Sequence, residues 1–372
     1  MSDRCVALDT TVAKLVRGGP WVYITELERA LGRVLGDRLR PIASRLAPPQ
    51  PGRRTAMDRL RTPARDLWWH QFGVTVAARR AGASLLHLPG GLGPMRRRLP
   101  TVLTIHDLNV LRFPHFFRRW SRYYGRIVLP RAARTADAII AVSHATKADV
   151  VERLSIPEDR VVVVPNGVDP AFAPLAAESP AARDVRHRHP LPRNFVLTVG
   201  FVEPRKNLPR LLEAIHRLRQ RAETADVTLV HAGPDGWLAN GVTETIRRLD
   251  LSQAVRFLGH VPRHDLVALY GVARLCAYPS LYEGFGLPVA EAMACGCPVV
   301  TSNVSALPEV AGGAAVLVDP GSVEEIAAGI AALWTDENRR RTLAARGLAR
   351  ARSFTWERTA RATAAVYEAV LA

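Results

Sequence analysis

The chain has 372 residues, of which 48% are hydrophobic, and a formal net charge of +17. This length exceeds what one ordinary core uses and predicts two domains, and the apolar fraction excludes a disordered chain. No run reaches the roughly 18 uncharged apolar residues of a membrane-spanning helix. Because Asp9 and Lys14 interrupt the first apolar run, we expect no signal peptide either.

The positive charge is concentrated in the first half of the chain, where residues 1–180 hold 28 Lys/Arg against 15 Asp/Glu. Such a basic half indicates an acidic partner: nucleic acid, an anionic membrane surface or a phosphorylated substrate. An arginine-rich genome composition explains the excess equally well. Only Lys14, Lys147 and Lys206 are lysines, which draws attention to Lys206.

The four cysteines lie mostly in apolar runs. Cys295 and Cys297 are too close together for a CxxC redox or zinc site, and no His/Cys pair lies nearby in the sequence. We therefore expect reduced core thiols in a cytosolic protein, with any membrane contact peripheral.

Short β-branched runs alternate with amphipathic helical runs along the chain, a pattern typical of parallel sheets buried on both faces. The fold class is therefore α/β. The expected strands are, in chain order, 5–8, 84–88, 101–105, 138–142, 161–164, 195–199, 227–231, 255–258, 275–278, 298–301 and 315–318.

A proline-rich stretch divides these strands into two sets, each sufficient for one doubly wound domain. We therefore predict a first domain at 1–178, a linker at 179–193 and a second domain at 194–355. Open α/β sheets bind ligands beyond the carboxyl ends of their strands. The candidate site residues are accordingly those that follow strands directly.

The first domain offers weaker signals. Gly18 and Gly19 precede a helix and could cradle a phosphate, although a double glycine alone is weak evidence. His106 and Asp107 follow the strand 101–105, where a catalytic group would sit, but a hydrogen-bonded structural histidine and a capping aspartate are the commoner readings. Ser143 is placed to cap the helix that follows it.

The second domain opens with a strand that ends at Gly200 and a loop that contains Arg205 and Lys206. Asn207 is placed to cap the helix that follows. Cations beside a helix N-terminus bind anions, and arginine in particular binds phosphate through two hydrogen bonds. A solvated cationic loop is the alternative, and the motif alone favours that alternative.

The stretch from Glu283 to Glu291 is more specific. It follows the strand 275–278 and reads Glu-Gly-Phe-Gly-Leu-Pro-Val-Ala-Glu. Glycines free the backbone for close approach to a ligand, and Pro288 suits a helix start near Leu287. We predict Glu283 on the loop and Glu291 in the first helical turn, where two carboxylates can hold sugar and ribose hydroxyls.

Taken together, these motifs resemble glycosyltransferase family 4. The resemblance covers nearly the whole chain, in family order: His106-Asp107, Val-Ser-x-x-Thr-Lys, Val-Pro-Asn-Gly-Val-Asp, Val-Gly-x-x-x-x-Arg-Lys-Asn-Leu, and the Glu-x7-Glu element with Ala-Met-Ala-x-Gly-x-Pro-Val-Val after it. It implies the GT-B fold, two Rossmann-like doubly wound parallel-sheet domains facing a central cleft, with the last helix, 356–372, packed on the first domain. It is nearest to the bacterial branch that includes mannosyltransferases of polysaccharide assembly.

The resemblance also implies roles. Arg205 and Lys206, beside Gly200, bind the donor diphosphate; Glu283 and the backbone of Phe285, Gly286 and Leu287 hold the donor sugar. Glu291 binds the ribose, His106 contacts the sugar near the reacting carbon, and the Gly18-Gly19 loop closes over the phosphates. The reaction is then a metal-independent, retaining hexosyl transfer without a cofactor. The co-substrate is a nucleotide sugar, GDP-mannose as the first choice, and the acceptor is a glycan or a lipid-linked sugar.

The N-terminal loop departs from the family pattern because Gly18-Gly19 is followed by Pro20 and bulky Trp21. Two other functions remain open. A non-catalytic family member is disfavoured by the complete set of motif residues. A binder of an anionic membrane surface or of nucleic acid is suggested by the basic, aromatic region 113–134, but no nucleic-acid motif is present and no nucleic-acid partner is expected.

Overall fold

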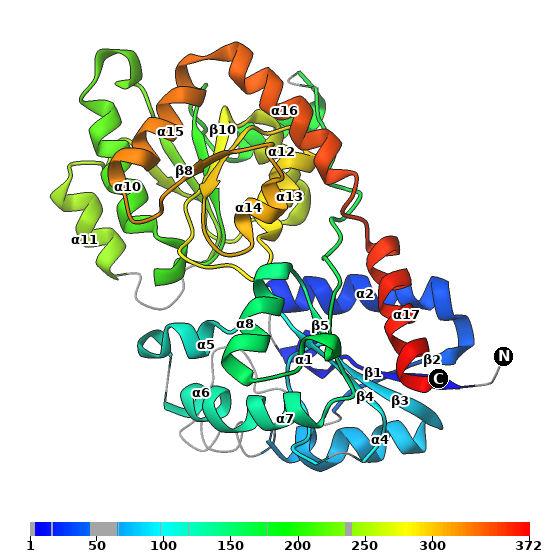
Figure 1. The fold of residues 1–372 in the computed structure, drawn as a ribbon. Helices are drawn as coiled ribbons and strands as arrows, with labels where there is room; N and C mark the ends of the chain where they lie inside the picture. The colour runs from blue at the N-terminus through cyan, green and yellow to red at the C-terminus, as the bar shows by residue number, and fades with distance from the viewer. Residues whose placement is uncertain are drawn as a thin grey trace. The chain divides into compact units, whose positions relative to one another are not determined.

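The computed structural model describes residues 4–15, 18–44, 65, 67–96, 98–117, 119–176, 178–234 and 240–372. The chain forms two compact units (Figure 1). Unit 1 comprises Met1–Gly167 together with Trp356–Ala372, and unit 2 comprises Val168–Thr355. The final helix, α17 (Trp356–Leu371), therefore belongs with the N-terminal unit. No helix within the described ranges is long and apolar enough to cross a membrane.

Unit 1 is built on a parallel six-stranded sheet of order β2-β1-β3-β4-β5-β6. Its strands are β1 (Cys5–Asp9), β2 (Leu39–Ile42), β3 (Ala83–Leu88), β4 (Thr101–Ile105), β5 (Ala138–Ala141) and β6 (Val161–Val163). Strand β2 was not expected from the sequence because Leu-Arg-Pro-Ile contains a charge and a proline. Pro41 is tolerated there because β2 is an edge strand, with neighbour β1 on one side.

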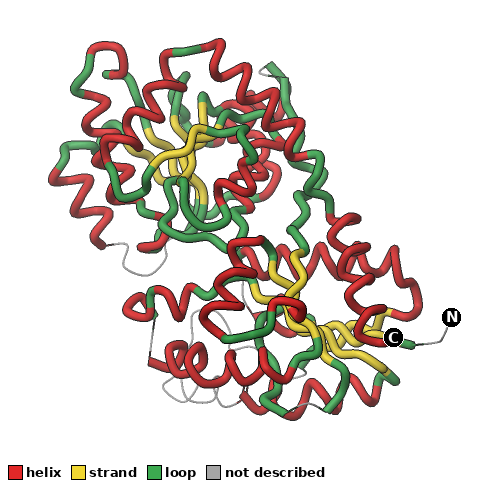
Figure 2. The backbone as a smooth tube through the Cα atoms, in the orientation of Figure 1, coloured by secondary structure: helices red, strands yellow, loops and turns green. Residues whose placement is uncertain are grey.

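Helices cover both faces of this sheet (Figure 2). Helices α4 and α7 pack on one face with a core that includes Val74, Leu86, Leu103 and Leu129. Helix α17 contacts α2 and strands β3, β4 and β5. The helices are α1 (Thr11–Leu15), α2 (Gly19–Leu35), a π-helical turn (Trp69–Gly73) that runs into α4 (Val74–Arg80), α5 (Asn109–Arg112), α6 (Arg119–Tyr123), a second π-helical turn (Tyr124–Val128), α7 (Leu129–Thr135), α8 (His144–Leu154) and α17.

Unit 2 contains the second parallel sheet, of order β12-β11-β10-β7-β8-β9. Its strands are β7 (Val196–Val199), β8 (Leu229–Ala232), β9 (Val255–Phe257), β10 (Leu275–Tyr278), β11 (Val299–Ser302) and β12 (Val316–Val318). All eleven expected strands are present, with ends within two residues of the prediction. The two Rossmann-like parallel-sheet domains are thus confirmed.

The segment expected as an interdomain linker is a packed part of unit 2. It contains α9 (Pro180–Arg188), which contacts α12 (Arg263–Val272). Buried Asp265 on α12 forms an ion pair with Arg188, and its carboxylate lies 3.2 Å from His189 Nε2. The units divide at Gly167, so residues 168–178 also lie in the second unit rather than in the first domain.

The remaining helices of unit 2 lie on both faces of its sheet (Figures 1 and 2). They are α10 (Leu208–Arg219), α11 (Asn240–Arg248), α13 (Leu287–Ala294), α14 (Leu307–Ala311), α15 (Val323–Thr335) and α16 (Glu337–Ala351). The chain runs outward from β7 to β9 and then returns to β10 on the other side of β7. The carboxyl ends of β7 and β10 therefore flank a topological switch point, the usual ligand position in such sheets.

Candidate active site

Two loops meet at the switch point of unit 2. The loop after β7 ends in a 3-10 turn, Pro204–Lys206, and the loop after β10 leads to α13. They are joined by hydrogen bonds from the Leu281 N–H to the Arg205 carbonyl (2.8 Å) and from the Arg205 guanidinium to the Tyr282 carbonyl (3.0 Å). The Ser280 hydroxyl oxygen lies 3.0 Å from the same Arg205 carbonyl oxygen. The loop predicted to bind the phosphates, after β7, and the loop predicted to bind the sugar, after β10, are thus hydrogen-bonded to each other.

Glu283 is the centre of this structure. Its carboxylate forms ion pairs with Arg205 and with Lys206, the latter at 2.7 Å, and accepts hydrogen bonds from the Tyr278 hydroxyl (2.9 Å) and the Ser280 hydroxyl (2.7 Å). Burial alone would raise its pKa, but the two cations and the bonds from Lys206 and Ser280 hold the pKa of Glu283 at about 2. The carboxylate is therefore ionised at neutral pH.

The two cations are screened by acids that surround them. Arg205 also pairs with Glu203 at 2.5 Å, so two acids face two bases in the cluster formed by Glu203, Arg205, Lys206 and Glu283. Lys206 contacts the Tyr278 hydroxyl and lies 4.7 Å from the centre of its ring. Burial, helped by Arg205, lowers the pKa of Lys206 despite both acids. The sequence reading missed Glu203, Tyr278 and Ser280, although each of them adjoins a motif residue or a strand end.

Asn207 stands at the N-cap position of α10, but its side chain makes no cap hydrogen bond, so the expected cap is wrong. The side-chain amide instead donates to the carbonyls of Pro279 (3.0 Å) and Pro320 (2.7 Å). Asn207 adopts left-handed backbone geometry with φ of 60°. It therefore connects the loop that follows β7 to the loops that follow β10 and β12.

Helix α13 begins at Leu287 with Pro288 in its first turn, as predicted. Gly286 precedes it with φ of 97°, a conformation that favours glycine, and a Cβ there would approach Leu307 Cδ2 to 2.6 Å. Helix α13, with its free first amides, thus follows the loop of Glu283, whose own N–H donates to Ser305 Oγ at 3.0 Å.

Glu291 is the fifth residue of α13 and lies in the second turn, so its predicted place in the first turn is wrong. Burial raises the pKa of Glu291 to about 7, with Arg263 and a hydrogen bond from the Tyr270 hydroxyl (3.4 Å) acting in the opposite direction. Arg263 is in turn paired with Asp169. Glu291 therefore belongs to a separate group, in which it is half-buried and titrates near neutral pH.

Glycines bring three successive loops of unit 2 into backbone contact. Gly200 has φ of 125°, and a Cβ on it would lie 3.3 Å from Lys206 Cε. A Cβ on Gly233, after β8, would come within 1.9 Å of the Gly200 carbonyl oxygen. The Gly233 N–H donates to the Gly259 carbonyl, after β9, at 2.8 Å. Gly233 was missed, although its position directly after a strand is a usable signal.

In unit 1, His106 follows β4 as expected. Its Nε2 lies 2.8 Å from the Pro89 carbonyl oxygen, and the ring of Tyr23 meets it edge-on at 4.6 Å. Burial lowers the pKa of His106. Asp107 accepts a hydrogen bond from the Asn109 N–H at 2.9 Å, but the N-cap residue of α5 is Leu108. The Ser143 cap is confirmed, since its hydroxyl accepts from the Thr146 N–H.

A buried polar chain behind His106 was not foreseen. His87 on β3 has Nδ1 2.6 Å from the hydroxyl of Tyr367 on α17 and Nε2 2.8 Å from the hydroxyl of Thr104. The Thr104 and Tyr23 hydroxyls lie 3.4 Å apart. Burial, and less strongly the nearby His106, lowers the pKa of His87 to about 3. The C-terminal helix thus supports the histidine candidate through residues far apart in the sequence.

Gly18 is the N-cap residue of α2 with φ of 126°, and Gly19 opens the helix with Pro20 in its first turn. The neighbouring Arg17 lies outside the described residues. The predicted site residues therefore fall into two sets. Gly200, Arg205, Lys206 and Glu283 come together in unit 2, whereas Gly18, Gly19 and His106 belong to unit 1.

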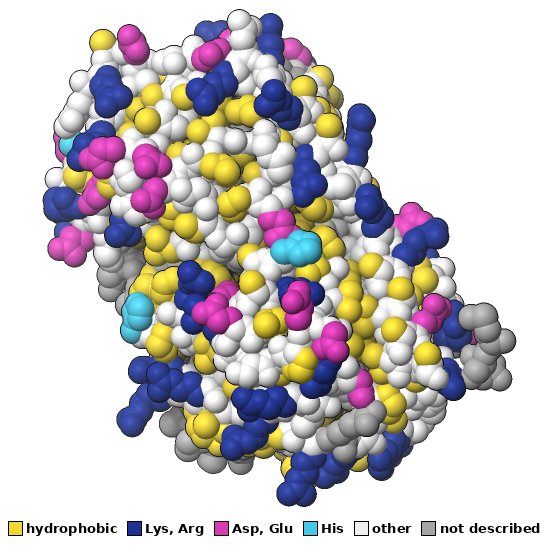
Figure 3. All heavy atoms as spheres, viewed as in Figure 1, with side chains coloured by type: hydrophobic (Ala, Val, Ile, Leu, Met, Phe, Trp, Pro, Cys, Tyr) yellow, Lys and Arg dark blue, Asp and Glu magenta, His cyan; other side chains and the backbone are white. Residues whose placement is uncertain are grey.

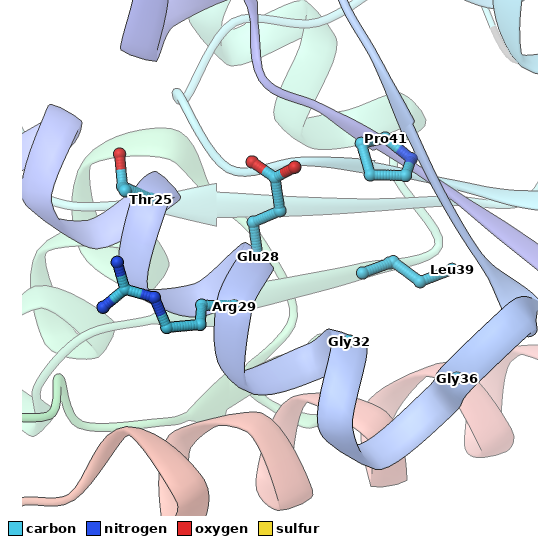
Figure 4. Close-up of a pocket in the computed structure, with 7 residues that line it drawn as sticks. All are labelled: Thr25, Glu28, Arg29, Gly32, Gly36, Leu39 and Pro41. Carbon is cyan, nitrogen blue, oxygen red and sulfur yellow. The ribbon is translucent and has the colours of Figure 1, made fainter.

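A shallow hollow of about 450 Å³ lies between α2 and the edge strand β2 (Figure 4). The Glu28 carboxylate lies between Thr25 and Pro41, and Arg29 extends away from Pro41. No predicted site residue lines this hollow. One acid and one base on adjacent helical positions are ordinary for a solvated helix, so we assign no role to it.

A family model described as "Glycosyl transferases group 1" matches residues 182–350, and one described as "Glycosyltransferase Family 4" matches residues 17–172. The chain is 35% identical over 269 residues to O-antigen chain mannosyltransferase B of Escherichia coli, an alignment that covers 72% of this chain and 70% of that protein. The chain belongs to glycosyltransferase family 4. It is thus a glycosyltransferase, and the motif residues Arg205, Lys206 and Glu283 form the cluster at the switch point.

Two further likenesses refine this assignment. The serotype-specific mannosyltransferase WbdA of Escherichia coli is 35% identical over 234 residues, which are 60% of this family 4 chain but 28% of WbdA. The chain therefore spans less than a third of that relative. Sucrose-phosphate synthase from Thermosynechococcus elongatus superposes with a TM-score of 0.77 at 20% identity and covers 99% of both chains. That likeness shows the GT-B fold alone.

Proposed function

We propose that this glycosyltransferase transfers mannose from GDP-mannose to a glycan or lipid-linked acceptor in polysaccharide assembly, with retention of anomeric configuration. The paired charges of Arg205, Lys206 and Glu283 at the switch point support this proposal most directly. The choice of mannose rests on the names of the relatives, and the choice of guanine on the branch that the motifs resemble. A cytoplasmic location with peripheral membrane contact fits such an acceptor.

The donor diphosphate is proposed to bind at Arg205 and Lys206. The turn geometry at Gly200 and the first amides of α13 add donors without bulk. Because the Glu283 carboxylate forms ion pairs with both cations, an incoming diphosphate has to replace Glu283 as their partner. We propose that this exchange releases Glu283 oxygens for the hydroxyls of the donor sugar, which the backbone from Phe285 to Leu287 also holds.

Glu291 is proposed to accept hydrogen bonds from the ribose hydroxyls. Its ionised form accepts at both oxygens, so its titration near pH 7 would tune donor affinity. The base is proposed to meet backbone groups around 259–262, beside the contact between Gly233 and Gly259. Such backbone contacts explain why side chains alone say little about the choice of base.

In the reaction itself, the bond between the anomeric carbon and the diphosphate breaks while the acceptor hydroxyl oxygen attacks from the same face, and the hydroxyl proton passes to an oxygen of the leaving diphosphate. Charge then accumulates on the leaving diphosphate, and Arg205 and Lys206, once drawn from Glu283, are proposed to stabilise it. These cations and the helix N-terminus can supply that stabilisation without a metal ion. His106, whose lowered pKa keeps it neutral, is proposed to contact the sugar near the reacting carbon.

The deciding experiment is a thermal-shift screen with GDP-, UDP-, ADP- and dTDP-sugars, because a ligand that binds only the native state raises the melting temperature. We expect GDP-mannose to give the largest shift and GDP alone a smaller one. NMR of the transferred sugar then reads the anomeric configuration. An inverted product would overturn retention, and a larger shift with a UDP-sugar would overturn the proposed base.

A further inference from the structure

Unit 1 exposes an apolar stripe along one helical face. The π-helical turn Trp69–Gly73 runs directly into α4. Trp68, Phe72 and Val76 follow one another at four-residue spacing there, with exposed fractions of 56%, 48% and 44%. Four-residue spacing places side chains on one face of a helix, and that face usually turns inward when it is apolar. Here Val74 and Ala78 face the core instead.

A second exposed aromatic pair lies on α6. Trp120 and Tyr123 are 39% and 50% exposed, and their rings stack at 5.6 Å. The loop 91–98 connects this region to the stripe. Gln71 donates to the Gly93 carbonyl (3.0 Å) and accepts from the Met95 N–H (2.9 Å).

The same loop is tied to α7, which continues the helical segment of α6. The Thr135 hydroxyl donates to the Pro94 carbonyl at 3.0 Å. The stripe and the stacked pair therefore belong to one connected side of unit 1.

Positive charge surrounds these apolar groups. From residue 67 to residue 136 the sequence contains 12 arginines and one acid, Asp107, which accepts a hydrogen bond from a backbone N–H. The Arg98 guanidinium lies 5.2 Å from the centre of the Phe72 ring. In Figure 3 the Lys and Arg side chains gather along the lower side of this unit. Seven of the exposed arginines of the region are Arg79, Arg80, Arg96, Arg98, Arg119, Arg122 and Arg126.

We propose that this side of unit 1, defined by Trp68, Phe72, Val76, Trp120 and Tyr123 with the seven exposed arginines, docks on an anionic lipid bilayer. We call it the lipid-docking side. Tryptophan and tyrosine prefer the interface between water and hydrocarbon, and arginines near an acidic leaflet are attracted to its surface potential. Nucleic acid would bind the arginines through its phosphates, but it would gain nothing from contact with the exposed aliphatic side chain of Val76.

This surface goes beyond the proposed sugar chemistry and does not depend on it. It would keep the enzyme where a lipid-linked acceptor lies, with apolar groups and charges acting together. One weak anchor gives marginal, reversible binding, whereas two signals of different kinds give stable attachment. Loss of either the stripe or the arginines should therefore weaken attachment strongly.

The test is co-sedimentation of the full-length chain with vesicles of phosphatidylcholine alone or with 30% (about one lipid in three) phosphatidylglycerol, at rising salt. We expect binding to the anionic vesicles only, with at least about a tenfold loss for the triple variant Trp68→Ser, Phe72→Ser, Val76→Ser. Arg119→Ser with Arg122→Ser should weaken binding and flatten its salt dependence. The matched controls Phe257→Ser and Arg217→Ser with Arg221→Ser, all in unit 2, should bind as the parent does.

The proposal would be overturned by no binding to anionic vesicles at low salt, or by equal binding of the stripe variant and its control. It would also be overturned if a short duplex DNA displaced the protein from the vesicles when the concentration of DNA phosphate charges was below that of the anionic lipid. Donor-induced thermal shifts in each variant report folding separately. Vesicle binding without a GDP-mannose shift would count against the proposed function alone, and a shift without vesicle binding against the docking side alone.

Discussion

The two units use positive charge in opposite ways. In unit 2 the cations of interest are few, buried or half-buried, and each is paired with an acid: Arg205 with Glu203 and Glu283, and Lys206 with Glu283. In unit 1 many arginines are exposed on one side that holds almost no acid. Paired charges in a desolvated site are held in position for chemistry, whereas exposed charges act at longer range and are screened by salt.

The comparison implies that single substitutions in the unit 2 cluster should be costly, because each member holds several others. In unit 1 a single arginine should matter little, since neighbours share its role. Substitutions in each unit can therefore test this contrast.

Lys206→Ala should lower kcat/KM by about 10²–10³, because it removes one of two cations proposed to stabilise the leaving diphosphate. The matched control is Lys147→Ala, whose partner is the well-exposed Glu158 at 3.3 Å. Turnover with GDP-mannose and the thermal-unfolding midpoint of both variants would be measured. Full activity in the Lys206 variant would refute the phosphate role.

Glu283→Gln should cost more activity than Glu203→Gln. Both changes remove an acid beside Arg205, but only Glu283 also holds Lys206, Tyr278 and Ser280. We expect a loss of about 10² for the Glu283 variant and less than about tenfold for the Glu203 variant. Steady-state kinetics at saturating acceptor would compare them. Equal losses would show that charge balance alone, rather than the contacts of Glu283, controls the site.

Glu291 should make donor affinity depend on pH in the neutral range. With a pKa of about 7, the carboxylate gains its charge as the pH rises from 6 to 8. Since the ionised form is the proposed ribose acceptor, the donor KM should fall by several-fold, at most about tenfold, across that interval. In the Glu291→Gln variant the donor KM should not change with pH, and it should be higher than that of the parent at high pH. A parent profile without this fall would contradict the assignment.

The sequence predicted most of the fold because buried parallel strands are short β-branched runs bounded by helices. It failed at β2, where Arg40 and Pro41 hide an edge strand, and at Glu291, because it placed that residue one turn too early. Arg205, Lys206 and Glu283 were predicted as site residues because the residues after strands share one edge of a sheet. Their mutual pairing was not predicted.

The missed contacts share a cause. The Lys206–Tyr278 contact spans 72 positions in the sequence and the His87–Tyr367 contact spans 280. No local pattern links such residues, since packing alone brings them together. The Asn207 cap failed for the same reason, because its amide donates to carbonyls of two distant loops and its side-chain oxygen accepts from Arg210. A buried histidine next to a catalytic candidate carries no local signal at all.

That histidine gives the smallest effect, and it concerns stability in unit 1 rather than turnover. Above pH 6.5 His87 is neutral in the folded and unfolded chain alike. Below pH 6.5 His87 binds a proton in the unfolded chain but not in the folded chain, where its pKa is about 3. Stability should therefore fall by up to about 1.4 kcal/mol between pH 6.5 and 5.5 from this residue.

Urea unfolding of the parent and of His87→Gln at several pH values between 5.5 and 7.5 would isolate this contribution, because glutamine can bond Tyr367 and Thr104 but does not titrate. The variant should lose the part of the pH slope that His87 causes, even if it is less stable overall. NMR titration of the His87 ring keeps the prediction open to refutation should the variant fold poorly. If the His87 ring protonates near pH 6, the polar chain between α17 and His106 is open to water. In that case buried contacts do not fix His106 in unit 1, in contrast to the paired cluster of unit 2.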